Sequence, residues 1–379
     1  MSLVVDEHRH YLSDEVRLDA FRAAIHRAVR GGDIVLDLAS GTGILGLFAC
    51  QAGASRVYSI EATGMIEIAR AVAAANGVSD RVVFVHGMST DVTLPERVDV
   101  IVCDQIGNFG FEAGLIQYGA DARDRFLRPG GRLVPERVDL YVAALESSAL
   151  HAQVAFWSAR PAGFDFGPVQ AWAGNTGYPT MIAAEMLLGP GRPVVGFAAE
   201  SMGSEALTGE VCLPVERAGT LHGLAGWFEA TLAGDVMLSS APSAAARVQR
   251  RNVFFPIDRP LEVLPGDVVR VGLHAIPSET VVTWTVEVMR AGRTVGRSRQ
   301  CTLHGMLINR ESLRRTDPRF VPTLTARGRA RLSVLELCDG TRPLAEIERE
   351  LLARHPDLFA ALPAAAAFVV EVVAGYSNP

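Results

Sequence analysis

One stretch constrains the fold more than any other: the apolar, strand-like residues 34–38 lead into a turn of small residues, 39–43 (ASGTG), and a helical pattern follows. Gly41 and Gly43 have no Cβ atom, so the backbone there can approach a ligand closely, and the helix that follows offers free N–H groups to an anion. A second strand ends in Glu61, where a carboxylate is placed to accept both hydroxyl groups of a ribose. This order of elements predicts a nucleoside-binding crevice.

Strand and helix patterns alternate from residue 33 to about 135, which predicts a parallel sheet covered by helices. An amphipathic helix over 14–30, with Ser13 as its N-cap, precedes them. The expected strands are 34–38, 56–60, 82–85, 98–103 and 132–134, and the expected helices are 44–52, 64–76 and about 114–127. We therefore assign residues 1–135 to an α/β domain of the Rossmann-like kind that includes the N-terminal helix.

After Pro135 the long helical periodicity gives way to short β-rich runs separated by Pro-Gly and Ala-Gly turns. This texture predicts an antiparallel β-barrel over residues 136–315, with an inserted arm at about 148–190. Three amphipathic segments follow Pro318, so we expect a small helical module over 316–379.

Composition narrows the function. The chain has 379 residues and a net charge of −6, and its nearest approach to a basic tract, 247–251, is short, so nucleic acid is not expected as a partner. The N-terminus does not read as a signal peptide, and no apolar run is long enough to span a membrane. The five cysteines never occur as C-x-x-C, which favours a reduced, cytoplasmic compartment and no structural zinc.

Several motifs occur in the order typical of one family. They are Asp14-Glu15-Val16-Arg17, the glycine turn, Ile60-Glu61-Ala62, Val98-Asp99-Val100-Ile101, Gly163-Phe164-Asp165 and His222-Gly223. Across about residues 6–305 the chain resembles the protein arginine methyltransferases. The resemblance implies an S-adenosylmethionine-binding domain, a β-barrel and a helical arm that makes a homodimer. Residues 318–379, which contain Leu337-Cys338-Asp339-Gly340-Thr341, resemble the small peptide-carrier modules related to PqqD, which implies a docking or accessory role.

The resemblance also implies which residues bind S-adenosylmethionine. Arg17 would pair with the carboxylate of the cofactor, Glu61 would hold the ribose, and the segment from Met88 would border the adenine. The full expected set is Arg17, Asp37, Gly41, Thr42, Gly43, Ile44, Glu61, Ala62, Met88 and Ser89.

The acceptor loop, residues 103–112, departs from the family pattern. The family clamps a guanidinium between two glutamates, whereas here the first acid is the shorter Asp104 and Glu112 follows one residue too early. A bidentate clamp depends on fine geometry, so we expect the grip on a peptidyl arginine to be lost. The Thr-His-Trp loop that completes the family's pocket falls near 247–249, where none of these residues occurs.

We therefore expect a methyltransferase that acts on a small specialised-metabolite nucleophile, such as C3 of an indole or the nitrogen of an amine or guanidine. Asp104 and Glu112 would be the catalytic pair, orienting an N–H of the acceptor and handling the displaced proton. Four further residues are assigned to substrate contact: Tyr11, Gln105, Asn108 and Phe109.

Two alternatives stay open. One is a protein arginine N-methyltransferase with a relaxed pocket, and the other is a non-catalytic scaffold that binds S-adenosylmethionine. A metal site is not expected, because the histidines at 8 and 10 lie too close in sequence to form a good one.

Overall fold

The computed structural model describes residues 4–203, 205–307 and 309–377. Its contacts divide the chain into two compact units, the first ending at Met306 and the second beginning at Leu307. The sequence pattern set the start of the last module at 316. The earlier division reflects the short helix α8 (Arg310–Arg315), which lies in the second unit, before the proline that marked the predicted boundary.

The first unit begins with two helices, α1 (Val4–Ser13) and α2 (Glu15–Ala28). The sequence did not predict α1, which buries none of its residues. The predicted N-cap Ser13 is wrong: Asp14 caps α2, because its Oδ1 accepts a hydrogen bond from the backbone N–H of Arg17 at 3.2 Å. This cap fixes the N-terminal turn of α2, which carries the Arg17 side chain.

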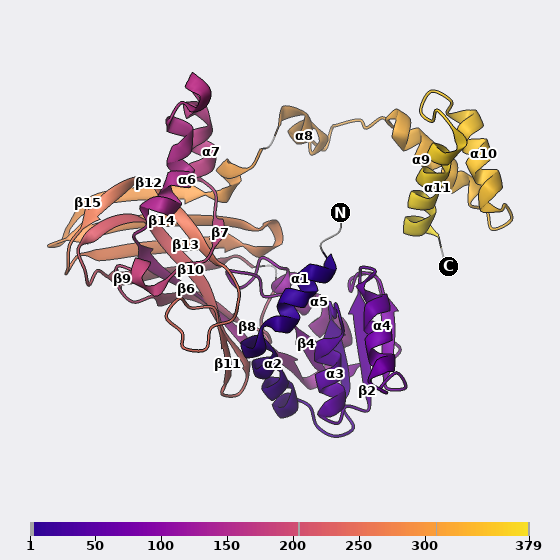
Figure 1. Ribbon diagram of the computed structural model, residues 1–379, viewed down its shortest axis with the longest axis horizontal. Coiled ribbons are helices and arrows are strands. Elements are labelled where there is room, and N and C mark those ends of the chain that lie inside the picture. The colour runs from indigo at the N-terminus through magenta and orange to yellow at the C-terminus, as the bar shows by residue number, and fades with distance from the viewer. Residues whose placement is uncertain (1–3, 204, 308, 378–379) are drawn as a thin grey trace. The chain divides into compact units, whose positions relative to one another are not determined.

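A five-stranded parallel sheet follows, with strand order β3-β2-β1-β4-β5, and Figure 1 shows it with α3 and α4. Its strands are β1 (Ile34–Leu38), β2 (Arg56–Glu61), β3 (Val82–His86), β4 (Val98–Cys103) and β5 (Leu127–Val134), and its helices are α3 (Ile44–Gln51), α4 (Met65–Ala75) and α5 (Leu115–Phe126). The strand order reverses between β1 and β4, and ligands of such sheets bind beyond the carboxyl ends of the strands there. The predicted Rossmann-like sheet is thereby confirmed.

Two antiparallel sheets form the barrel-like part. One has the order β7-β12-β10-β6-β8 with β11 paired to β10, and the other has the order β15-β14-β13-β9. Their strands are β6 (Arg137–Leu145), β7 (Tyr178–Thr180), β8 (Arg192–Ala198), β9 (Leu207–Pro214), β10 (Gly219–Ala233), β11 (Val236–Ser239), β12 (Asn252–Val263), β13 (Val268–Ile276), β14 (Val281–Arg290) and β15 (Arg293–Cys301). Strand β8 contacts β9 and β12 contacts β15, so the two sheets meet along both edges.

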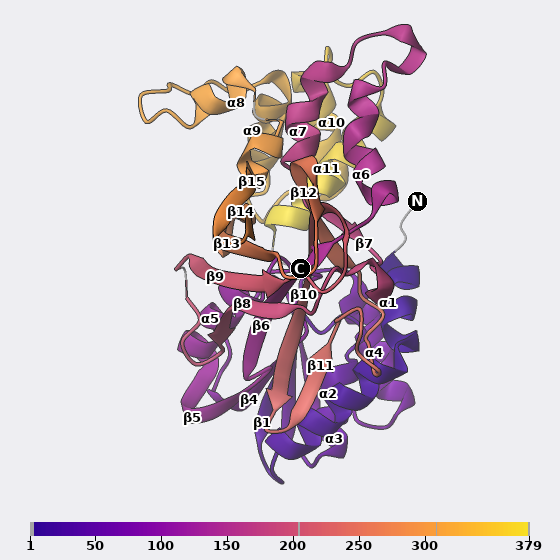
Figure 2. The same ribbon diagram turned by 90° about the vertical axis from the view of Figure 1, so that its left-hand side faces the viewer.

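The arm leaves the barrel between β6 and β8 and projects from it in both views (Figures 1 and 2). It contains α6 (Ser148–Ala155), α7 (Gln170–Gly174) and the short 3₁₀ turns Phe156–Ser158, Pro161–Gly163, Gly167–Val169 and Ala184–Met186. Two further 3₁₀ turns, Pro277–Glu279 and Thr302–Gly305, belong to the barrel. Several large apolar side chains of the arm are exposed: Phe156, Phe164, Phe166, Trp172 and Met181.

One hydrophobic cluster runs through both parts of the first unit. It includes Phe21 of α2, Ile101 of β4 and Phe228 of β10, all at most 1% exposed. Helix α2 contacts α3 and β5 on one side and β10 and β11 on the other, which ties the parallel sheet to the barrel. Residues from the barrel are therefore held at a defined position beside the ends of the parallel strands.

The second unit contains α8 and three packed helices, α9 (Ala326–Leu337), α10 (Leu344–Arg354) and α11 (Leu362–Tyr376). They bury Val334, Leu351 and Val369 completely, and Phe359 packs on Phe368 with ring centroids 5.2 Å apart. The predicted helical module is confirmed as a small unit with its own core. Among the described residues, no helix is long and apolar enough to cross a lipid bilayer.

Candidate active site

The cofactor turn, residues 39–43, joins β1 to α3 through alternate residues with positive φ. Ala39, Gly41 and Gly43 have φ of 55°, 54° and 77°. A Cβ atom on Gly41 would lie 2.4 Å from Cε1 of His8, so α1 lies directly against the turn. The positive φ favours glycine at position 41, and a Cβ atom there would displace the His8 ring from the turn.

Glu61 is buried at the end of β2, and its two carboxylate oxygens have different partners. Oε2 accepts the backbone N–H of Gly41 at 2.9 Å. Oε1 accepts the backbone N–H of Thr63 at 2.9 Å and its hydroxyl at 2.7 Å. These bonds hold the carboxylate beside the turn in one orientation, as the predicted ribose-binding role requires.

Asp37 is fully buried within β1. Its Oδ2 accepts the backbone N–H of Gly46 at 2.8 Å, while Oδ1 has no hydrogen-bond partner in the part of the chain that the structure describes. The pKa of Asp37 is raised to about 7, chiefly by burial; the N–H of Gly46 opposes this rise, the charge of Glu61 adds to it and the charge of Arg17 opposes it. An unpartnered buried oxygen beside the turn is suited to accept a donor from a ligand.

Asp104 follows β4 and lies between two arginines. Arg17 of α2 donates through Nε to Oδ2 at 2.5 Å. Arg250, from the segment before β12, donates through Nη2 to Oδ1 and Oδ2, both at 2.7 Å. The side chains of Arg17, Asp104 and Arg250 are only 8%, 10% and 12% exposed, so water screens these charges little.

Glu112 turns back under the acceptor loop. Its carboxylate accepts the backbone N–H groups of Asn108 and Phe109, the latter at 3.0 and 3.1 Å, and that of Phe111 at 3.4 Å. This fold requires glycine at position 107, where φ is 82° and a Cβ atom would lie 2.5 Å from the Glu112 carboxyl carbon. The two predicted catalytic acids therefore have different surroundings: guanidinium groups surround Asp104, and backbone amides surround Glu112.

The other predicted substrate residues lie around the same loop. Phe109 is 2% exposed and packs on Phe255 of β12 with ring centroids 5.0 Å apart, so it anchors the loop to the barrel and does not present an open ring. Gln105 and Asn108 are half-buried. Tyr11 of α1 donates its hydroxyl to Glu7 at 2.8 Å, and its backbone carbonyl accepts Nη1 of Arg17 at 3.3 Å.

The remaining residues predicted to bind the cofactor lie in the turn, at the start of α3 or after the neighbouring strands. Thr42 is buried and Ile44 opens α3. Met88 is 40% exposed after β3, and Ser89 is buried, its carbonyl accepting Nη1 of Arg125 at 2.9 Å. Ala62 is exposed next to Glu61.

Sequence reasoning missed three residues of this site: Arg250, His8 as a lid on Gly41, and Thr63 as a partner of Glu61. A signal for Arg250 was present. The cluster 247–251 holds three arginines in a chain with a net negative charge, directly before a buried strand. Basic side chains at such a position are expected to pair with a buried acid.

These residues fit S-adenosylmethionine. Glu61 would hold the ribose, Asp37 and the turn the amino-acid part, and Arg17 the carboxylate. When bound, the cofactor supplies an electrophilic methyl carbon on a sulfonium. No group of three metal-ligating side chains occurs among the described residues.

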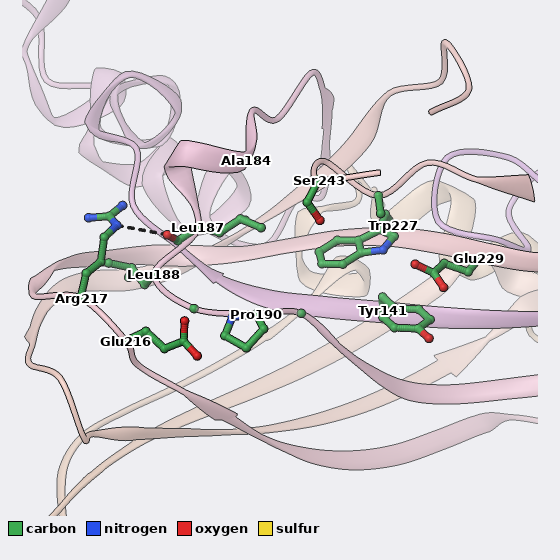
Figure 3. Close-up of a pocket in the computed structure, with 13 residues that line it drawn as sticks. Tyr141, Ala184, Leu187, Leu188, Pro190, Glu216, Arg217, Trp227, Glu229 and Ser243 are labelled. Carbon is green, nitrogen blue, oxygen red and sulfur yellow. Dashed lines mark hydrogen bonds between the residues drawn. The ribbon is translucent and has the colours of Figure 1, made fainter. Parts of the chain in front are cut away.

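A separate cavity of about 550 Å³ lies in the barrel (Figure 3). Tyr141 and Trp227 stack on one side of it with ring centroids 5.8 Å apart, and Glu229 lies beside the edge of the indole that carries nitrogen. Its lining includes no residue of the cofactor turn or the acceptor loop, so it is distinct from the candidate active site.

Two family models match the chain in adjoining ranges. A methyltransferase domain matches residues 35–131, and the arginine methyltransferase oligomerization subdomain matches residues 136–284. A Rossmann-like sheet with this turn followed by such a subdomain defines a class I methyltransferase that depends on S-adenosylmethionine. The predicted fold class, enzyme class and cofactor are confirmed.

The relatives define the family. The protein arginine N-methyltransferase PRMT10 of Oryza sativa subsp. japonica is 31% identical over 307 residues, which cover 72% of this chain and 80% of that protein. A probable protein arginine N-methyltransferase 6.1 of Oryza sativa subsp. indica is 38% identical over 154 residues, which cover 40% of this chain and 41% of that protein. The chain belongs to the protein arginine N-methyltransferase family.

Solved structures agree on the fold. The Trypanosoma brucei PRMT1 enzyme–prozyme heterotetrameric complex with AdoHcy gives a TM-score of 0.70 at 21% identity, covering 78% of this chain and 96% of that one. The structure of protein arginine methyltransferase 10 of Arabidopsis thaliana gives a TM-score of 0.66 at 24% identity, covering 78% of this chain and 97% of that one. The likeness of residues 318–379 to a carrier module related to PqqD stays a prediction.

Proposed function

We propose that this methyltransferase transfers the methyl group to a guanidinium nitrogen of arginine in protein substrates, which the sequence analysis held only as an alternative. The names of the relatives support this, and one observation in the site carries it: both oxygens of Asp104 accept hydrogen bonds from a guanidinium, that of Arg250, at 2.7 Å. Both bonds come from the one nitrogen Nη2, so the shorter acid can hold an N–H group of a guanidinium between its two oxygens, a bridging geometry in place of the two-nitrogen fork.

Each residue then has a defined task. Asp104 orients the acceptor guanidinium and takes the proton that the nitrogen loses as its bond to carbon forms. Glu112 holds the backbone of the loop around the acceptor, because its carboxylate accepts hydrogen bonds from the N–H groups of Asn108, Phe109 and Phe111. The hydrophobic packing of Phe109 keeps the loop against the barrel and excludes water from this side.

The test is methylation of a glycine- and arginine-rich peptide with deuterated S-adenosylmethionine, read by mass spectrometry. A peptide of the same length with every arginine replaced by lysine is the matched control. We expect labelled methylarginine in the first peptide only. Absence of label from a panel of arginine-rich peptides, with S-adenosylhomocysteine still bound, would contradict the proposal.

A second candidate is favoured by the surroundings of Glu112. This carboxylate is engaged by backbone amides, which leaves Asp104 as the acid of the pair that faces other side chains. One carboxylate suffices to hold the N–H of a small acceptor, such as an indole methylated at C3, an amine or a free guanidine. Turnover of such compounds, with no label in arginine peptides, would support this candidate over the first.

We also propose that the protein forms a homodimer through the arm. The exposed apolar residues of the arm favour this assembly. The C-terminal module has its own core and is proposed to dock a partner. Gel filtration with light scattering tests the first proposal, and deletion of residues 316–379 with unchanged methyl transfer to a peptide would be consistent with the second.

A further inference from the structure

Arg250 holds the position that an acceptor guanidinium needs. Its Nη2 bridges both oxygens of Asp104 at 2.7 Å, and its Nη1 donates to the carbonyl of Gly107 at 3.2 Å. The side chain is thus bound by the acid and the backbone of the acceptor loop, the same two kinds of group that would bind a substrate.

The charges around Asp104 do not balance. Arg17 and Arg250 place two cations on one carboxylate, and all three side chains are at most 12% exposed. Glu112, the other acid of the loop, is turned to the backbone amides. Burying a cation is costly unless it is fully paired, and without the cofactor carboxylate assigned to Arg17, Arg250 must share its one anionic partner with Arg17.

A neighbouring arginine shows what a structural role looks like in this segment. Arg247 donates to the carbonyl of Ile182 at 2.9 Å and to Oδ1 of Asn252 at 2.8 Å, both neutral partners within the barrel and the base of the arm. Gln249 donates its backbone N–H to Asp14 at 2.7 Å, which fixes the segment to α2. These contacts hold the segment in place, so the segment does not depend on Arg250 alone.

We propose that Arg250 is an internal guanidinium that occupies the acceptor-binding carboxylate and must be displaced before an external guanidinium binds. The proposal rests on the proposed function of Asp104 as the acceptor-binding acid. Arg250 then sets specificity: it excludes weakly binding guanidines and admits acceptors that gain enough contacts elsewhere to displace it.

Substitution of Arg250 tests this through KM. In Arg250→Met the competitor is absent, and we expect KM for an arginine peptide to fall about tenfold or more, the scale of one charge-assisted bond, with kcat little changed. Arg250→Lys keeps the charge but lacks the planar fork, so its KM is expected between the other two. Arg251→Met, at an exposed neighbouring position, is the matched control and should keep the wild-type KM.

A binding measurement separates this inference from the proposed function, because it needs no methyl transfer. Agmatine, a small guanidine, is titrated calorimetrically into each protein saturated with S-adenosylhomocysteine. We expect its affinity to rise about tenfold in Arg250→Met and less in Arg250→Lys, even where no arginine peptide is methylated. Equal agmatine affinities in the wild type and both variants, or a KM for the arginine peptide that rises in both variants, would overturn the inference. Arg250 would then have a structural role only.

Discussion

The cofactor turn and the acceptor loop follow the neighbouring strands β1 and β4, yet they are held by different kinds of contact. The turn is closed by residues near it in sequence: Asp37 binds the N–H of Gly46, nine positions away, and Glu61 binds that of Gly41, twenty positions away. Asp104 is held by Arg17 and Arg250, which are 87 and 146 positions away. One site is built locally, and the other is built by the tertiary fold.

Because they are held differently, the cofactor turn and the acceptor loop should respond differently to substitutions. The turn needs particular residue types for its backbone, as at Gly41, and its function fails if they change. The acceptor loop needs a balance of charges brought from α2 and the barrel. A single substitution in any of three distant segments alters that balance, so we expect acceptor binding to be more sensitive to distant substitutions than cofactor binding.

The largest effect is expected for Asp104→Ala, which removes the one anion between two buried cations. Leaving Arg17 and Arg250 uncompensated should lower the free energy of unfolding by about 3–5 kcal/mol and abolish methyl transfer. Urea denaturation measures the first effect. Asp19→Ala, which removes an exposed pair with Arg22, is the control and should change stability by less than about 1 kcal/mol. Similar values for both variants would mean that the acceptor loop is not held by charge.

At the cofactor turn the expected effect is a pH dependence. The pKa of Asp37 is raised from 3.8 to about 7, so the folded protein keeps a proton that the unfolded chain has lost between these values. The free energy of unfolding should therefore fall as pH rises from about 4 to about 7, by an amount on the order of 4 kcal/mol. In Asp37→Asn this contribution to the slope should vanish, because no titrating group remains at that position.

Urea titrations at several pH values, without cofactor, measure the slope. Asp19→Asn, at an exposed position, should keep the wild-type slope. An unchanged slope in Asp37→Asn would show that this carboxyl is ionised in the folded protein throughout the range. S-adenosylhomocysteine affinity should fall in Asp37→Asn at pH 8 even as the variant becomes more stable, because binding and stability make opposite demands on this charge.

The contrast between the locally built cofactor turn and the acceptor loop, which distant residues hold, also explains which features could be predicted from the sequence. The strands of the parallel sheet and the turn could be predicted because small residues, apolar runs and an acid at a strand end are local signals. The sequence places Asp104 and Glu112 in one loop after β4, but it could not predict their contacts, since no local signal indicates that Arg250 binds one acid and backbone amides bind the other. Helix α1, which buries none of its residues, was not predicted.

Glu112→Gln sharpens the comparison within the acceptor loop. A glutamine side chain offers one acceptor oxygen and an NH₂ group that faces the N–H donors of Asn108 and Phe109, so the loop should lose its shape. We expect kcat to fall by about 10²-fold, the scale of misplacing a reacting group by about 1 Å, and the free energy of unfolding to fall by about 1–2 kcal/mol. Wild-type kcat together with lowered stability would leave Glu112 as a loop anchor without a part in the chemistry.

The smallest effect on the chain itself is expected at the arm, where Phe164 and Trp172 are 69% and 40% exposed. Replacing both by serine removes apolar surface that a homodimer would bury, so sedimentation velocity should show a monomer, while the free energy of unfolding changes by less than about 0.5 kcal/mol per site. Met237→Ser, exposed on β11, is the control and should stay dimeric. Asp37 and Glu61, which hold the cofactor turn, lie on the parallel sheet and not on the arm, so S-adenosylhomocysteine affinity should stay within about twofold in the monomer. A large loss of affinity on dissociation would mean that the turn also depends on a second chain, and the distinction between a locally built cofactor site and a tertiary acceptor site would fail.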